Sequence, residues 1–160
     1  MKVAFYVGNH RADGIMARIG WAITRLVQKG PYSHITHCEA IHAEHADGTV
    51  TIASASVRDG GVRSKRTKLN PAHWWIVDVP QWDVEQSIDF LTHTAGMKYD
   101  WRGAVATVFL GSQQTARWFC NEHVSAPFLR ASGTFGPNHL TAICLSLGRD
   151  VTAEFFESRK

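Results

Sequence analysis

Cys120 is the residue whose local sequence best suits nucleophilic chemistry. It follows Trp118 and Phe119 and precedes Asn121-Glu122-His123, so that a regular helix can begin near the cysteine. A thiol at a helix N-terminus feels the positive end of the helix dipole and free N–H groups, which stabilise the reactive thiolate. The same N–H groups can hold an oxyanion. The alternative is a buried structural cysteine, the commoner fate of a lone cysteine.

His34 and His37 are the candidate bases for this thiol. If their segment is a strand, His37 shares one face with Glu39, and His34 lies on the other face. A histidine two residues from a carboxylate is a plausible base with an orienting partner. The alternative is an exposed polar strand face without a catalytic role.

The histidine-rich segment also has a zinc interpretation. Its candidate ligands are His34, His37, Cys38 and His42. On a strand these side chains do not converge on one side, and the spacing of a zinc finger or of a helical His-Glu-x-x-His motif is absent. We therefore expect no metal and no other cofactor.

Tyr99 is a further candidate for the site. It begins the segment Tyr99-Asp100-Trp101-Arg102-Gly103, which opens an apolar run. Its hydroxyl could contact an oxyanion or a substrate, whereas a tyrosine beside a tryptophan is more commonly part of the core. Asp100 could serve as a helix cap.

The composition is that of one globular domain spanning residues 1–160. Apolar residues make up 44% of the chain, charged residues make up 19%, and the net charge is +3. This weak charge does not indicate a nucleic-acid partner. The clearest cluster of basic residues is best interpreted as the solvated face of a strand or loop. Its members are Arg63, Lys65, Arg66 and Lys68.

The number of cysteines and the length of the apolar runs indicate the cellular compartment of the protein. Three cysteines, Cys38, Cys120 and Cys144, argue against a disulfide framework and suit a reducing compartment. The segment 1–8 does not resemble a signal peptide, and no apolar run approaches the length of a membrane span. We expect a cytoplasmic protein without integral membrane association.

Periodicity and turn residues predict the order of elements. A helix capped by Asp13 is followed by several short strands and then by helices. This segregation predicts an α+β fold with an antiparallel sheet packed against helices. The strands are expected at 3–7, 35–43, 50–57, 62–69 and 74–79, and the later helices after Asp83, at 101–110, at 118–129 (shortened or kinked by Pro127) and from an Asn138 cap to Leu147.

Four stretches of the chain, taken in order, resemble a known family. They are Thr36-His37-Cys38-Glu39, Arg58 to Arg63, Tyr99 to Gly103, and Trp118 to Glu122. Their order and spacing are similar to those of the circularly permuted, YiiX-like branch of the NlpC-type papain-like superfamily, and phage and prophage chains are especially similar. The resemblance implies a permuted papain-like fold in which a histidine on the sheet precedes a cysteine on a packed helix.

The resemblance also implies roles for particular residues. The nucleophile corresponds to Cys120. Both histidines match part of the motif, and His37 is favoured because Glu39 then falls in the expected place, with His34 as the alternative base. Some relatives carry the orienting group on the following strand, which here offers only Ser54 or Ser56, so that Glu39 is the expected third residue.

These expectations describe a thiol hydrolase that cleaves an amide bond. The family resemblance suggests peptidoglycan stem peptides as the substrate. Two alternatives remain open: an acyltransferase or lipid-acyl hydrolase of the same fold, and a non-catalytic phage structural or binding module. A protein acting on the cell wall would be virion-associated or released by a phage export route.

Overall fold

A computed structural model describes residues 1–8, 30–100, 117–129 and 136–159. The helix expected after Asp13 and the apolar helix expected at 101–110 lie outside these residues. Within the described ranges, no helix combines the length and the apolar character needed to cross a membrane.

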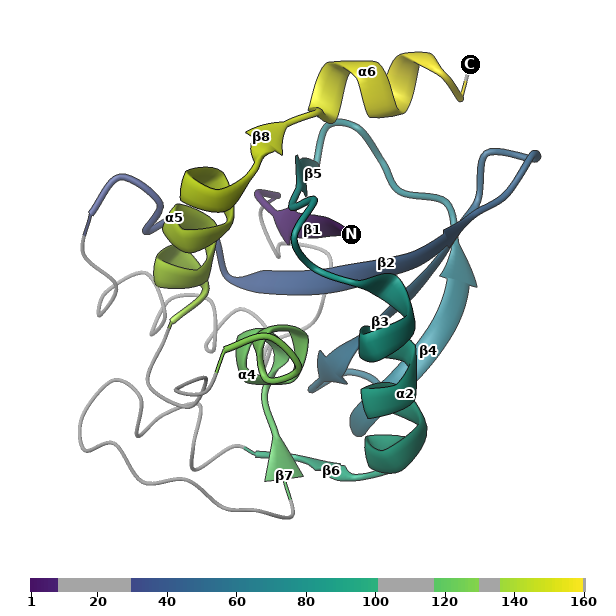
Figure 1. Ribbon diagram of the computed structural model, residues 1–160, viewed down its shortest axis with the longest axis vertical. Helices are drawn as coiled ribbons and strands as arrows, with labels where there is room; N and C mark the ends of the chain where they lie inside the picture. The colour runs from purple at the N-terminus through teal and green to yellow at the C-terminus, as the bar shows by residue number, and fades with distance from the viewer. Residues whose placement is uncertain (9–29, 101–116, 130–135, 160) are drawn as a thin grey trace.

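The described residues form one eight-stranded sheet, shown in Figure 1. The strand order is β7-β6-β4-β3-β2-β1-β5-β8, and every pairing is antiparallel except that of β6 with β7. The predicted α+β class is therefore confirmed. The strands are β1 (Lys2–Tyr6), β2 (His37–Glu44), β3 (Val50–Ser56), β4 (Gly61–Thr67), β5 (Trp74–Asp78), β6 (Lys98–Tyr99), β7 (Arg117–Trp118) and β8 (Arg149–Asp150).

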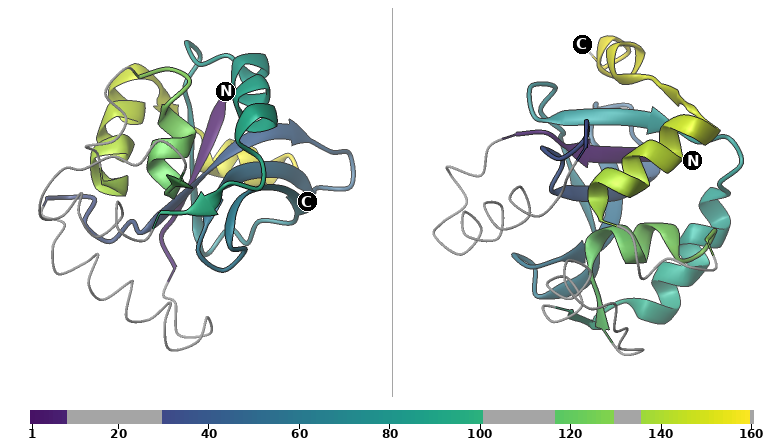
Figure 2. Two further views of the ribbon diagram at one scale, coloured as in Figure 1. Left: turned by 90° about the horizontal axis from the view of Figure 1, so that it is seen from below. Right: turned by 90° about the vertical axis from the view of Figure 1, so that its left-hand side faces the viewer.

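Helices pack on both faces of this sheet. On one face, α4 and α5 lie side by side, whereas α6 lies beyond β1 and β5 on the other face (Figures 1 and 2). α2 packs against β2 and β4. The helices of the described residues are α2 (Val84–Thr94), α4 (Cys120–Ser125), α5 (Pro137–Leu147) and α6 (Thr152–Glu157).

Strand alternation separates the core into two clusters. In β1, Val3 and Phe5 join the cluster beneath α4 and α5, and Ala4 joins the cluster beneath α6. This is the period of two expected for a strand buried on both faces. The first cluster also contains Cys120 and Leu140, so burial of apolar surface holds the start of α4 against the sheet.

Local details differ from expectation in the last third of the chain. The helix expected at 118–129 begins only at Cys120 and ends at Ser125, before Pro127. The cap expected at Asn138 is wrong, because Gly136 is the N-cap and Pro137 occupies the first turn. Proline suits this position because it has no backbone N–H that needs an acceptor there.

The turn between β3 and β4 contains two glycines with different requirements. Gly60 has a φ of +81°, and a Cβ added to it would meet no atom within 4 Å. A Cβ on Gly61 would lie 2.0 Å from the carbonyl oxygen of Met97. Val62 donates a backbone hydrogen bond of 2.8 Å to that same oxygen. Gly61 therefore permits the close approach that places β6 beside β4.

Gly61→Ala is expected to destabilise the protein more than Gly60→Ala. The Gly60 variant suffers only the left-handed backbone penalty of about 1–2 kcal/mol. The Gly61 variant must displace the Met97 backbone, at an expected cost of about 3 kcal/mol or more. Urea unfolding of both variants measures the difference, and equal losses of stability would contradict the close-approach interpretation.

Candidate active site

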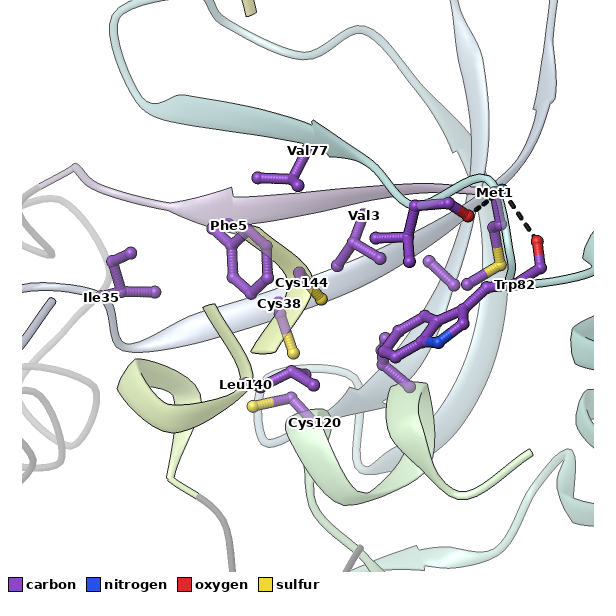
Figure 3. Close-up of a cluster of buried hydrophobic side chains, with 13 residues drawn as sticks. Met1, Val3, Phe5, Ile35, Cys38, Val77, Trp82, Cys120, Leu140 and Cys144 are labelled. Carbon is purple, nitrogen blue, oxygen red and sulfur yellow. Dashed lines mark hydrogen bonds between the residues drawn. The ribbon is translucent and has the colours of Figure 1, made fainter. Parts of the chain in front are cut away.

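Cys120 is the first residue of α4 and packs against the sheet (Figure 3). Cys120 is 4% exposed, and Phe119, the N-cap residue of this helix, has no side-chain acceptor for the N–H groups of the first turn. A hydrogen bond from the Cys38 thiol lowers the pKa of Cys120 well below its ordinary value; burial opposes this shift, and the charge and hydrogen bond of His37 reinforce it. The thiolate is therefore the favoured form of Cys120.

His37 is the first residue of β2, and its side chain lies close enough to Cys120 for each to shift the pKa of the other. Its Nε2 lies 2.8 Å from Oε1 of Glu39, which leaves Nδ1 to exchange a proton with the thiol. Burial lowers the pKa of His37, but the Cys120 and Glu39 charges outweigh it and raise the pKa to about 9. The stable state of the pair is thus a thiolate beside an imidazolium.

Arg63 on β4 holds Glu39 with two hydrogen bonds. Its terminal nitrogens lie 2.6 Å from Oε2 and 2.5 Å from Oε1 of Glu39, which is only 2% exposed. Burial alone would raise the pKa of Glu39, but His37 and Arg63 together lower it to about 2. The carboxylate therefore remains charged and fixed in orientation.

A second carboxylate extends this arrangement to the surface. Nε of Arg63 donates to Oδ2 of Asp59 at 2.6 Å, and Asp59 precedes the glycine pair of the β3–β4 turn. Cys120, His37, Glu39, Arg63 and Asp59 thus form a row of alternating charges, which we call the charge chain. Each member faces a neighbour of opposite sign, which favours the ionised form of every group.

The sheet register explains how Arg63 reaches Glu39. Ser54 on the intervening strand β3 pairs with Arg63, and its backbone carbonyl accepts a hydrogen bond from Arg63 at 3.2 Å. The Ser54 hydroxyl instead donates to the carbonyl of Ala55 at 3.3 Å. Glu39, and not Ser54, is therefore the side chain that holds the His37 ring.

The other histidines predicted as site residues are arranged differently. His34 lies exposed in the turn before β2, and among the described residues the imidazole that hydrogen-bonds to Cys120 is that of His37. Nε2 of His42 lies 2.9 Å from the Ser87 hydroxyl on α2. Within the described ranges, no group of three or more His, Cys, Asp or Glu side chains is arranged to hold a metal ion.

Tyr99 on β6 is half-buried and close enough to Cys120 to be affected by its charge. Burial, followed by the charges of Cys120, Cys38 and Asp100, raises the pKa of the Tyr99 hydroxyl well above its ordinary value. Tyr99 therefore remains protonated and can act as a hydrogen-bond donor beside the thiol.

Sequence reasoning missed the role of Arg63. The basic cluster was predicted to be a solvated face, which is wrong for Arg63, because its side chain is 14% exposed and paired on both sides. Arg66 in the same strand is 55% exposed, as that prediction requires. The available signal was the Asp59–Arg63 spacing together with a glutamate in an otherwise apolar stretch of β2, which needs a cation if it is buried.

Comparisons of the chain with protein-family models, with curated proteins and with solved structures gave no match. A stabilised thiolate, an imidazolium and a carboxylate that orients the imidazole are the groups required for nucleophilic catalysis with proton transfer.

Glu39→Gln is expected to lower the pKa of His37 from about 9 toward its ordinary 6.5. The Glu39 carboxylate attracts the imidazolium, so its removal makes the ring release its proton at lower pH. Titration of the His37 ring by NMR measures the shift. Asp89→Asn, an exposed carboxylate on α2, serves as the control and should leave the His37 pKa unchanged.

Arg63→Met is expected to reduce the free energy of unfolding by about 3–5 kcal/mol, because it leaves a buried carboxylate without its cation. Arg66→Met is the matched control, since it breaks an exposed ion pair with Asp47 and should cost at most about 1 kcal/mol. Adding Glu39→Gln to Arg63→Met should restore part of the loss. Similar losses in the two single variants would show that the Glu39–Arg63 pair does not behave as a buried one.

Proposed function

We propose that the protein is a cysteine hydrolase in which Cys120 is the nucleophile, His37 is the acid and base, and Glu39 orients His37. The observation that supports this proposal most strongly is the charge chain, in which the His37 imidazolium adds to the effect of Cys38 in favouring a Cys120 thiolate. A cysteine that serves only as part of the core would be expected to be a neutral thiol. Cys144 is an example, because burial raises its pKa.

The reaction begins when the Cys120 thiolate attacks the carbonyl carbon of an amide. The resulting tetrahedral intermediate collapses as His37 donates its proton to the leaving amine, and a thioester forms on Cys120. Neutral His37 then takes a proton from water, which attacks the thioester and releases the acid. Glu39 keeps the ring oriented and stabilises its positive charge in both half-reactions.

Stabilisation of the oxyanion is assigned to donors around Cys120. Backbone N–H groups at the start of α4 have no side-chain cap, and the protonated Tyr99 hydroxyl lies in the same neighbourhood. Donors of this kind favour the tetrahedral intermediate over the planar carbonyl when they are held in place before the reaction.

The proposed substrate is an amide bond in a peptidoglycan stem peptide, and the proposed fold is the permuted NlpC-type papain-like fold. The support is that stretches carrying the family resemblance converge at one site. Glu39 contacts Arg63, and Tyr99 lies near Cys120. The sheet histidine also precedes the helix cysteine in the chain, which is the order of the permuted branch.

Cys120→Ser and His37→Ala are each expected to lower the rate of stem-peptide cleavage by about 1000-fold or more, because nucleophile and base act as a unit. His34→Ala is the matched control, and its rate of stem-peptide cleavage should remain close to that of the wild type. The measurement is the release of new amino groups from purified peptidoglycan, followed by identification of the fragments by mass spectrometry.

Alkylation by iodoacetamide distinguishes the proposed hydrolase from the alternative of a binding module that has the same fold and no activity. A thiol with a lowered pKa reacts at pH 6, where an ordinary thiol of pKa about 8.5 is almost entirely protonated. Reaction at Cys120 should therefore persist at pH 6 in the wild type and decline in His37→Ala, which removes the adjacent positive charge. A Cys120 with the reactivity of an ordinary thiol would refute the proposed mechanism.

A further inference from the structure

Cys38 is a second thiol beside the proposed nucleophile, and the mechanism above gives it no covalent role. It lies on β2 between His37 and Glu39 in the sequence, and it is fully buried. Cys38 and Cys120 belong to the same core cluster, to which Cys144 on α5 also belongs. All three are free thiols.

The two thiols lie close together. Cys38 and Cys120 belong to the same core cluster, and the thiol and the backbone of Cys38 both lower the pKa of Cys120. Figure 3 shows the Cys38 side chain directed from its strand toward the start of α4, where Cys120 lies. α4 packs directly on β2, so none of the described elements lies between the two residues.

The pair combines a reactive sulfur with a protected one. Burial, the hydrogen bond to Cys120 and the neighbouring negative charges raise the pKa of Cys38 well above its ordinary value, so that Cys38 remains a thiol while Cys120 is a thiolate. An oxidant therefore attacks Cys120 first, since oxidation follows thiolate character. With 4% of Cys120 exposed, a small oxidant such as a peroxide reaches its sulfur more readily than a bulky one does.

We propose that Cys38 and Cys120 are a reversible oxidation site, in which a peroxide oxidises Cys120 and Cys38 then closes a Cys38–Cys120 disulfide. In the first step the Cys120 sulfur attacks one peroxide oxygen, the O–O bond breaks, and the departing hydroxide takes a proton to become water. In the second step the Cys38 sulfur attacks the sulfur of the Cys120 sulfenic acid, and the sulfenic oxygen leaves as water with the Cys38 proton. Two thiols are oxidised and one peroxide is reduced to two waters.

The second step is favoured by the first. Conversion of the Cys120 thiolate to a neutral sulfenic acid removes one of the negative charges that hold Cys38 in its protonated form. The disulfide would remove the nucleophile from the proposed hydrolase in a form that a thiol reductant can restore. It would also protect Cys120 from irreversible oxidation. The proposed oxidation site rests on the proximity of the two thiols in one core cluster and does not depend on hydrolase activity.

The test treats the reduced wild-type protein with hydrogen peroxide, then denatures it in N-ethylmaleimide and measures intact and peptide masses. We expect one N-ethylmaleimide adduct, on Cys144, and a mass about 2 Da below that of the reduced chain carrying one adduct. We also expect a linked pair of peptides containing Cys38 and Cys120, and full reversal by dithiothreitol. In Cys38→Ser, dimedone should trap the sulfenic acid of Cys120. When dimedone is left out, Cys120 should gain about 32 Da as a sulfinic acid. Cys144→Ser is the matched control and should behave as wild type.

Three outcomes would overturn the proposal. They are formation of a sulfinic acid at Cys120 in the wild type as readily as in Cys38→Ser, a disulfide that joins Cys144 to either partner, and no oxidation of Cys120. Because the wild-type measurement is sufficient to refute it, the proposal remains testable if Cys38→Ser does not fold. The oxidation test measures the mass of the protein and not its activity. A protein that is inactive toward peptidoglycan would therefore refute the proposed function without affecting the test of the disulfide.

Discussion

A buried carboxylate is the constraint on which the arrangement of this site depends. Glu39 is almost completely removed from solvent, and a lone charge in such a position is strongly unfavourable. Arg63 meets this need from two strands away, with both carboxylate oxygens engaged. A buried ion pair contributes little net stability compared with a well-packed apolar pair. Its evident consequence is orientation, because Glu39 in turn fixes the ring of His37.

The charge chain makes the protonation of Cys120 a property of the sheet as well as of the helix that carries it. His37 and Glu39 come from β2 and Arg63 comes from β4, so their alignment depends on the register of β2, β3 and β4. The helix that carries Cys120 has only six residues and no side-chain cap. Cys38 and His37, which lower the pKa of Cys120, both belong to β2, so the sheet and not only the helix determines the state of this thiol.

The sequence was sufficient to predict the parts of this site that local spacing controls. His37 and Glu39 are two residues apart, so strand geometry alone placed them together. Arg63 and Cys38 were missed because their contacts depend on register and on helix docking, which no local pattern encodes. The two-residue strands β6 and β7 were missed because two residues carry no periodicity.

The two edges of the sheet have a consequence for association between molecules. The outermost strands, β7 and β8, each contain two residues and begin with an arginine. A neighbouring chain that added itself as a further strand would find too few unpaired backbone groups to form a stable ladder, and a charged side chain would oppose its approach. The brevity of β7 and β8 therefore limits growth of the sheet by pairing with either of these two strands.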